Sequence, residues 1–309
     1  MIDYTLDTLV NTLQLLPLMP SVQALFTPAN YGTILDFEMM NKLYPIASNV
    51  AEEYFVYYFD QVYNQNVYDY YLPYRGIGNR LREVCFVDTT GQEVLIDRLR
   101  PEEIASKMDI RGQTLSPFKV GFYLVNNRIH LYFNNWAGTA SFPTLRMKYL
   151  RQPNNLVFKA AVAQVLSINS SLNQITLTGT PPASTYLTTV TYDFISNVPP
   201  FISWQDDIVC TNITGTVMTF ATTIPAGLQK GDWVCLSGQS PVPQIPVSGI
   251  NYLLQLGAAK CLEIQGDAQG FGIAKSQADE MKQYFIDVIT PRVDGNPIKL
   301  SSIDSIWDN

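Results

Sequence analysis

The hydrophobic pattern is helical at both ends of the chain. Apolar residues recur at steps of three and four in five segments: residues 3–16, 33–44, 49–61, 248–268 and 271–288. This spacing gives each predicted helix one apolar stripe. Pro17 and Pro45 should end the first two helices, because proline cannot continue a helical hydrogen-bond ladder. Asp3, Ser248 and Asp267 stand where N-cap residues are expected.

The last two predicted helices are separated by a cluster of small residues. Gln265-Gly266-Asp267 is followed by Gly270 and Gly272. Glycine inside a helix costs about 1 kcal/mol relative to alanine, so the cluster indicates a tight reversal. A single kinked helix is the alternative, since the apolar phase nearly survives the junction. Residues 290–297 contain two prolines and should stop the second helix.

The middle of the chain changes to a period of two. Strands are expected at residues 84–87, 93–96, 121–125, 128–133, 141–149, 158–166, 174–177, 188–194, 207–210, 216–220 and 232–236. Asn126-Asn127 is a good two-residue hairpin turn. Turn-rich stretches separate the later strands at intervals of roughly ten residues, which favours a sandwich or a small barrel.

These patterns predict an α+β protein in which a large β domain is inserted into a helical bundle. The N- and C-terminal segments form the bundle, and the insert is an antiparallel β-sandwich or barrel. The predicted boundaries are 1–71 for the first part of the bundle, 72–247 for the β domain, 248–290 for the helix hairpin and 291–309 for an extended tail. An apolar helical stripe needs a partner, which the two ends supply for each other.

The composition suits an assembly protein. Charged residues make up 15% of the 309 residues, against about 25% in typical soluble proteins, and there are 18 tyrosines. The net charge of -7 argues against a general nucleic-acid binder, which needs a basic face. No apolar run approaches the roughly 18 residues of a membrane span, so no membrane association is expected. The four cysteines form no CxxC pair and are expected to be free and mostly buried.

An aromatic run from residue 54 to residue 74 leads into an arginine-rich stretch. The run is expected to pack a core and an interface rather than to stack a ligand. The stretch lacks the lysine and strand–loop–helix context of a phosphate loop. Its arginines should instead pair with acidic residues of the same or a neighbouring subunit. The candidate subunit-interface residues are Tyr74, Arg75, Arg80 and Arg82.

Candidate catalytic groups are scarce. His130 is the one histidine, lies in a predicted strand and is expected to be structural. Asp206-Asp207 could bind calcium or supply half of a glycosidase carboxylate pair, but a solvated strand start is the simpler interpretation. No catalytic residue, cofactor or metal site is therefore expected.

The C-terminal segment carries a resemblance to a known family. Residues 263–275 (EIQGDAQGFGIAK) and 289–299 (ITPRVDGNPIK), together with 73–84 and 231–246, resemble head-to-tail connector proteins of tailed bacteriophages, also called portal adaptors or neck rings. In that family a helical bundle docks under the portal ring, and the C-terminal tail inserts into the portal. The chain differs from the smallest adaptors by its large β insertion.

The resemblance implies a non-enzymatic virion protein that forms a ring, of twelve copies by analogy, in the neck between head and tail. Its partners would be the portal protein, other neck or tail proteins and further copies of itself, and DNA would pass through the lumen without specific binding. It would be made in the cytoplasm of the host bacterium. The candidate portal contacts are Arg292, Ile298, Leu300, Ile303, Ile306 and Trp307. The alternative function is a carbohydrate-binding or depolymerising tail protein, suggested by the β domain and the aromatic run.

Overall fold

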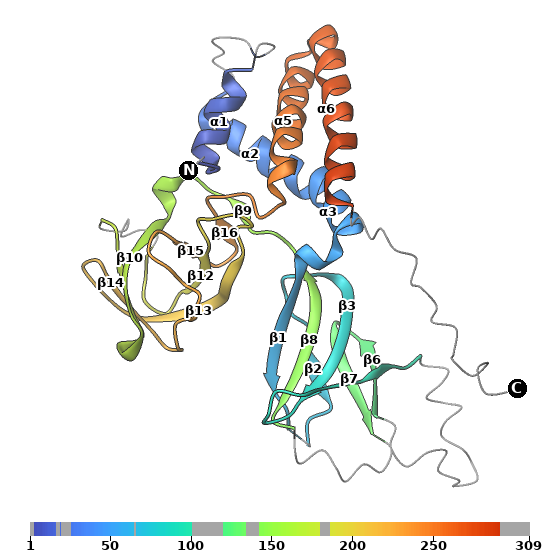
Figure 1. Cartoon of the computed structure of the whole chain (residues 1–309), viewed down its shortest axis with the longest axis vertical. Helices are drawn as coiled ribbons and strands as arrows, with labels where there is room; N and C mark the ends of the chain where they lie inside the picture. Colours follow the sequence, from blue (N-terminus) through green and yellow to red (C-terminus); the bar gives the residue numbers. More distant parts are fainter. Residues whose placement is uncertain are drawn as a thin grey trace, which may run out of the picture.

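The structure is a computed structural model that describes residues 3–16, 19, 26–64, 66–100, 120–133, 142–179 and 186–290. These residues form an α+β fold with many antiparallel strands, as predicted. Figure 1 shows three parts: helices from both ends of the chain, a closed barrel and a pair of sheets. The barrel and the paired sheets lie on the same side of the helices.

The helical part is organised around one central helix. It contains α1 (Leu6–Gln14), α2 (Pro28–Glu38), the π-helical turn η1 (Met39–Leu43), α3 (Tyr44–Val50), α5 (Ile250–Gln265) and α6 (Ala268–Ile289). Helix α5 contacts α1, α2 and α6, and these helices share one apolar core. Gly257 makes the close approach possible, because a Cβ there would lie 2.8 Å from Cδ2 of Leu35.

The predicted reversal between the last two helices is confirmed. Helix α5 ends at Gln265, and the capping residue Gly266 has a φ of 77°, the left-handed conformation that glycine adopts most readily. Asp267 then caps α6 by accepting a hydrogen bond from the Gly270 N–H at 2.9 Å. The predicted cap at Ser248 is wrong, because a 3₁₀ turn (η6, Val247–Gly249) precedes α5 and Gly249 takes the N-cap position. Thr5, rather than Asp3, is the N-cap of α1.

Both predicted ends of the second helix are wrong. The second helix begins at Pro28 and continues beyond Pro45, since α2, η1 and α3 follow one another without a break. The π-helical turn shifts the hydrogen-bond ladder just before Pro45, which lies in the first turn of α3. Proline is tolerated in the first turn of a helix, because the N–H that it lacks needs no partner within the helix there.

The third predicted helix, over residues 49–61, is wrong, because its second half is a strand. After α3 and a 3₁₀ turn (η2, Glu52–Phe55), the chain forms β1 (Val56–Val62), which pairs with β8. The segment is dense in aromatic and β-branched residues, which favour a pleated surface over a helix. Two strands, β1 and β2, therefore lie within the range 1–71 that was assigned to the helices.

Two four-stranded sheets pack against each other through a common apolar core. The first has the order β1-β8-β3-β4 and the second β2-β7-β6-β5. Their further strands are β2 (Asp69–Tyr71), β3 (Gly76–Val87), β4 (Glu93–Leu95), β5 (Asp97–Arg98), β6 (Val120–Val125), β7 (Arg128–Phe133) and β8 (Thr144–Arg151). Asn126 and Asn127 both have positive φ, as the predicted β6–β7 hairpin turn requires.

The remaining strands close into a barrel with the order β10-β11-β14-β13-β12-β15. They are β10 (Ala163–Asn169), β11 (Gln174–Leu177), β12 (Thr191–Ile195), β13 (Ser203–Thr214), β14 (Val217–Phe220) and β15 (Trp233–Leu236), with 3₁₀ turns η4 (Lys159–Ala161) and η5 (Ser170–Leu172). A short parallel pair, β9 (Asn155–Leu156) and β16 (Gln239–Ser240), flanks the barrel. Of the two predicted β architectures, the barrel is the one formed by this region.

Candidate functional site

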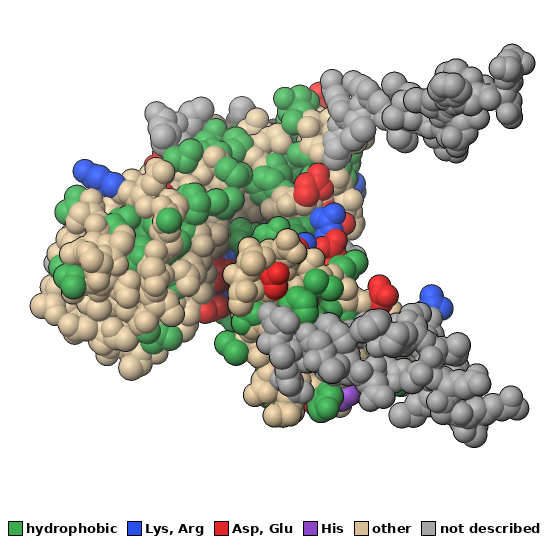
Figure 2. Space-filling model, turned by 60° about the horizontal axis from the view of Figure 1, so that its bottom comes forward, with side chains coloured by type: hydrophobic (Ala, Val, Ile, Leu, Met, Phe, Trp, Pro, Cys, Tyr) green, Lys and Arg blue, Asp and Glu red, His purple; other side chains and the backbone are tan. Residues whose placement is uncertain are grey.

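A group of buried and partly buried charged side chains lies where the barrel meets the paired sheets. The sheets contribute two arginines: Arg75, just before β3, and Arg151, the last residue of β8. The barrel contributes Asp193 from β12, with Asp206 and Asp207 from β13. Figure 2 shows acidic side chains gathered in the hollow between the two β parts. We call these five residues the junction cluster.

Each arginine of the junction cluster makes a bidentate pair. Nη1 and Nη2 of Arg75 donate to the two carboxylate oxygens of Asp193 at 2.6 and 2.9 Å. Nη2 also donates to Asp207 at 2.7 Å. Nε and Nη2 of Arg151 donate to the carboxylate of Asp206, both at 2.8 Å. Paired hydrogen bonds of this kind fix orientation as well as distance, so they set how the barrel faces the sheets.

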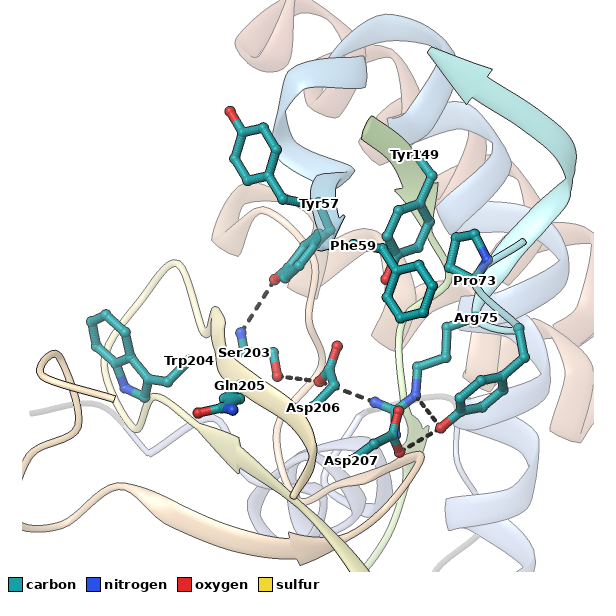
Figure 3. A pocket seen from close by; sticks show the side chains of 12 residues that line it. Tyr57, Phe59, Pro73, Arg75, Tyr149, Ser203, Trp204, Gln205, Asp206 and Asp207 are labelled. Atoms are coloured by element: carbon teal, nitrogen blue, oxygen red, sulfur yellow. Dashed lines mark hydrogen bonds and ion pairs between the residues drawn. The ribbon is translucent and has the colours of Figure 1, made fainter. Parts of the chain in front are cut away.

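A bulge in β13 explains how the adjacent Asp206 and Asp207 both reach Arg75, at 3.0 and 2.7 Å. Neighbouring side chains in a regular strand point to opposite faces. Here the β12–β13 register shifts between Tyr192 and Phe194, and Asp207 has a φ of 59°. Its N–H donates to Asp193 at 3.0 Å, which holds the bulge in place. In Figure 3 the side chains of Asp206 and Asp207 point toward Arg75.

Amide side chains complete the cluster. Asn154 accepts a hydrogen bond from Arg151 at 2.7 Å and donates one to Asp193 at 2.8 Å. Gln244 accepts one from Arg151 at 3.1 Å. Arg75 is 8% exposed, Arg151 2% and Asp193 not at all. Such burial requires that nearly every donor and acceptor be paired, and these amides satisfy that requirement.

Burial and pairing act in opposite directions on these groups. Burial raises the pKa of Asp193, and the hydrogen bond from Arg75 opposes that rise without cancelling it. Burial works against the charge on Arg75 as well, but Asp193 and Asp206 outweigh it and raise the pKa of the guanidinium. Both arginines therefore stay charged, and each of the three carboxylates is held by a guanidinium. None of the three is placed as a free general base.

A cavity of about 410 Å³ lies beside the junction cluster. Its lining is largely aromatic and comes from both β parts: Tyr57, Tyr58, Phe59, Pro73, Tyr74, Tyr149, Ser203, Trp204 and Gln205, in addition to Arg75, Asp206 and Asp207. The hydroxyl of Tyr57 accepts a hydrogen bond from the Ser203 N–H at 3.2 Å, which bridges the two sides (Figure 3).

The predicted arginine pairing occurs within the chain. The guanidinium of Arg75 pairs with carboxylates of the barrel. The hydroxyl of Tyr74 donates a hydrogen bond to Asp207, while Tyr74 itself is exposed. Arg82 is exposed on β3, and the Arg80 side chain lies outside what the structure describes. Their assignment to a subunit interface stays a prediction. The interpretation of Asp206-Asp207 as a solvated strand start is wrong.

Sequence reasoning missed Asp193, Arg151, Asn154 and Gln244. Asp193 did leave a signal, because a carboxylate between the apolar residues of the segment TYDFI needs a buried partner. Nothing local in the sequence marks the other three. All six candidate portal contacts, from Arg292 to Trp307, lie outside the described residues.

His130 and the cysteines show no catalytic arrangement in the described chain. His130 pairs with Asp69 at 2.8 Å on the surface of the second sheet, beside the rings of Tyr68 and Tyr123. All four cysteines are free and buried, as predicted, and burial raises the pKa of Cys261 to about 12. No group of three or more His, Cys, Asp or Glu residues in the described ranges is placed to hold a metal ion.

Comparison of the sequence with protein-family models and with curated proteins gives no match. Among the helices that the structure describes, none is both long enough and apolar enough to cross a membrane.

Proposed function

We propose that this chain is a non-enzymatic virion protein that forms a connector ring between the portal and the tail of a tailed bacteriophage. The helical part is the bundle that docks on the portal, and residues 291–309 seat in it. The ring has twelve copies by analogy, and its acidic character lets DNA pass without being held.

The α5–α6 hairpin is the observation that carries this proposal. The segment 263–275, on which the resemblance rests most, forms the Gly266 reversal and the first turns of α6. Helix α6 leaves three large apolar side chains exposed: Ile273 (45%), Tyr284 (59%) and Val288 (51%). An exposed apolar helix face that leads into an apolar segment is typical of a surface that a partner covers.

The β parts are assigned to the outside of the ring. They form a collar, or a docking face for the next tail component. The junction cluster supports this role, because bidentate ion pairs give the barrel one fixed orientation against the sheets.

Deletion of residues 298–309 tests the proposal. Phage particles assembled with the truncated protein should yield filled heads and free tails that do not join, as scored by electron microscopy. A finer pair of variants is Ile303→Asp/Ile306→Asp against the matched Ser301→Asp/Ser302→Asp, which adds the same charge at polar positions. Joined particles at the normal yield with the truncated protein would refute the proposal.

The cavity beside the junction cluster favours a second candidate function, the carbohydrate-binding tail protein. Aromatic rings such as Tyr57 and Tyr58 next to carboxylates are a common lining for sugars. A glycan array with the purified chain, followed by Tyr57→Ala for any sugar that binds, separates the two functions. Binding lost in that variant would favour the tail protein over the connector.

A further inference from the structure

A second cavity, of about 590 Å³, runs along the helical part between α3 and the α5–α6 hairpin. Its floor is apolar and includes the buried side chains of Tyr252, Leu256 and Ala278. Its rim carries four lysines, Lys42, Lys260, Lys275 and Lys282, together with the carboxylates of Glu263 and Asp279. We call this feature the lysine groove.

The lining of the lysine groove carries four lysines against two carboxylates, Glu263 and Asp279, in a chain whose net charge is -7. Two of its lysines are paired: Lys42 with the buried Glu38 at 2.7 Å, and Lys260 with Glu263 at 2.9 Å. Lys275 and Lys282 make no ion pair with any residue that the structure describes. They are seven residues apart on α6, so they lie on one face about 10 Å apart.

The sequence that follows α6 has the opposite character. Residues 300–309 (LSSIDSIWDN) contain four large apolar residues and two aspartates, with no lysine or arginine. The aspartates, Asp304 and Asp308, are about 13 Å apart in an extended chain. The apolar floor of the lysine groove and the excess of lysines over carboxylates on its rim therefore suit this apolar, acidic segment.

The connecting residues allow the segment to reach the groove of its own chain. Lys282 lies about 12 Å back along α6 from Thr290. Residues 291–303 span about 40 Å when extended. Asp294-Gly295 is a turn-forming pair, so the sequence favours a reversal soon after the helix ends.

We propose that residues 300–308 occupy the lysine groove of the same chain, antiparallel to α6. Asp304 then lies beside Lys282 and Asp308 beside Lys275, while Ile303, Ile306 and Trp307 cover the apolar floor. The proposal concerns the isolated protein and does not rest on the proposed function. If the groove contact and the proposed function are both correct, the lysine groove holds residues 300–308 until the portal binds them instead.

Hydrogen exchange of the full-length protein tests this contact. Amides of residues 300–308 should exchange about tenfold more slowly than in a free peptide of the same sequence. Lys275→Glu/Lys282→Glu should abolish the protection. Adding Asp304→Lys and Asp308→Lys to that variant should restore it, since the charges are then exchanged rather than lost. Lys230→Glu, at an exposed lysine on the barrel, is the matched control and should change nothing.

Two results would overturn the proposal. One is a wild-type segment that exchanges as fast as the free peptide. The other is protection that disappears on dilution, which would assign the groove to the segment of a second copy. Thermal unfolding of each variant confirms that lost protection is not lost folding. The exchange experiment contains no portal. A negative result would therefore refute the groove contact without bearing on the head-to-tail joining experiment.

Discussion

The barrel is attached to its two neighbours by contacts of opposite chemistry. Toward the helices it presents an apolar cluster: Val162, Ile195, Phe201, Trp233, Cys235 and Val242, with Tyr4, Val157 and Val247 packed against it. Toward the paired sheets it presents the junction cluster, in which five charged side chains meet. We call these the apolar contact and the ionic contact.

The two contacts fix different properties of the molecule. Apolar packing is non-directional and tolerates small shifts, so the apolar contact holds the barrel on the helices without dictating its angle. Bidentate ion pairs are directional, and in burial each needs its partner. The ionic contact therefore sets the angle between the two β parts and is the more easily broken by a single change.

Removal of one arginine should give the largest effect. Arg75→Leu leaves the fully buried carboxylate of Asp193 without its bidentate partner. Loss of one member of a buried pair costs about 3–5 kcal/mol of unfolding free energy. Urea unfolding measures this loss. The double variant Arg75→Leu/Asp193→Asn should recover part of it, because no unpaired charge is then buried.

Arg146→Leu is the matched control on the same sheet. Arg146 also pairs with two carboxylates, those of Asp60 and Glu93, but its side chain is 26% exposed against 7% for Arg75. Exposed pairs contribute about 0–1 kcal/mol. Equal losses for the two arginine variants would show that the ionic contact is no stronger than a surface pair.

A change in the apolar contact should have an intermediate effect. Val242→Ala removes two buried methyl groups from a side chain that is 2% exposed, which should cost about 2 kcal/mol. The loss should be the same at low and high salt, because no charge is involved. Val209→Ala is the control, since Val209 is 39% exposed on β13 and should lose no more than about 0.5 kcal/mol. A strong salt dependence of the Val242 loss would contradict the apolar description.

Local signals in the sequence predicted the elements of this fold better than their junctions. The α5–α6 hairpin follows from helical periodicity with Gly266 and Asp267 at the reversal, and the β6–β7 hairpin from Asn126-Asn127. A helix was wrongly predicted over residues 49–61, because their aromatic and apolar residues fit both a helical and a strand period. Pairing with β8, which the local pattern does not reveal, decided between them.

The junction cluster depends on contacts that no local pattern encodes. Arg75 and Asp193 are separated by 118 residues, and their pairing exists only once the barrel has closed. The bulge that turns Asp206 and Asp207 toward one arginine is a register shift between two strands. Sequence alone can show that Asp193 needs a partner, but not which residue supplies it.

The smallest effect is expected at the exposed rim of the apolar contact, where Asp3 pairs with Lys159. Burial alone would raise the pKa of Asp3, but hydrogen bonds from Lys159 and Thr5 outweigh it and lower the pKa to about 2. A lowered pKa stabilises the fold above pH 4, and this stability is lost as the pH falls from about 4 to 2. Asp3 is 44% exposed, so solvent screening limits the contribution to less than about 1 kcal/mol.

Asp3→Asn should therefore lose that small amount at pH 7 and show a shallower decline in acid, measured by urea unfolding between pH 2 and pH 7. An acid decline as steep in Asp3→Asn as in the wild type would show that the pair at the rim contributes nothing, and that the apolar contact holds the barrel there without electrostatic help.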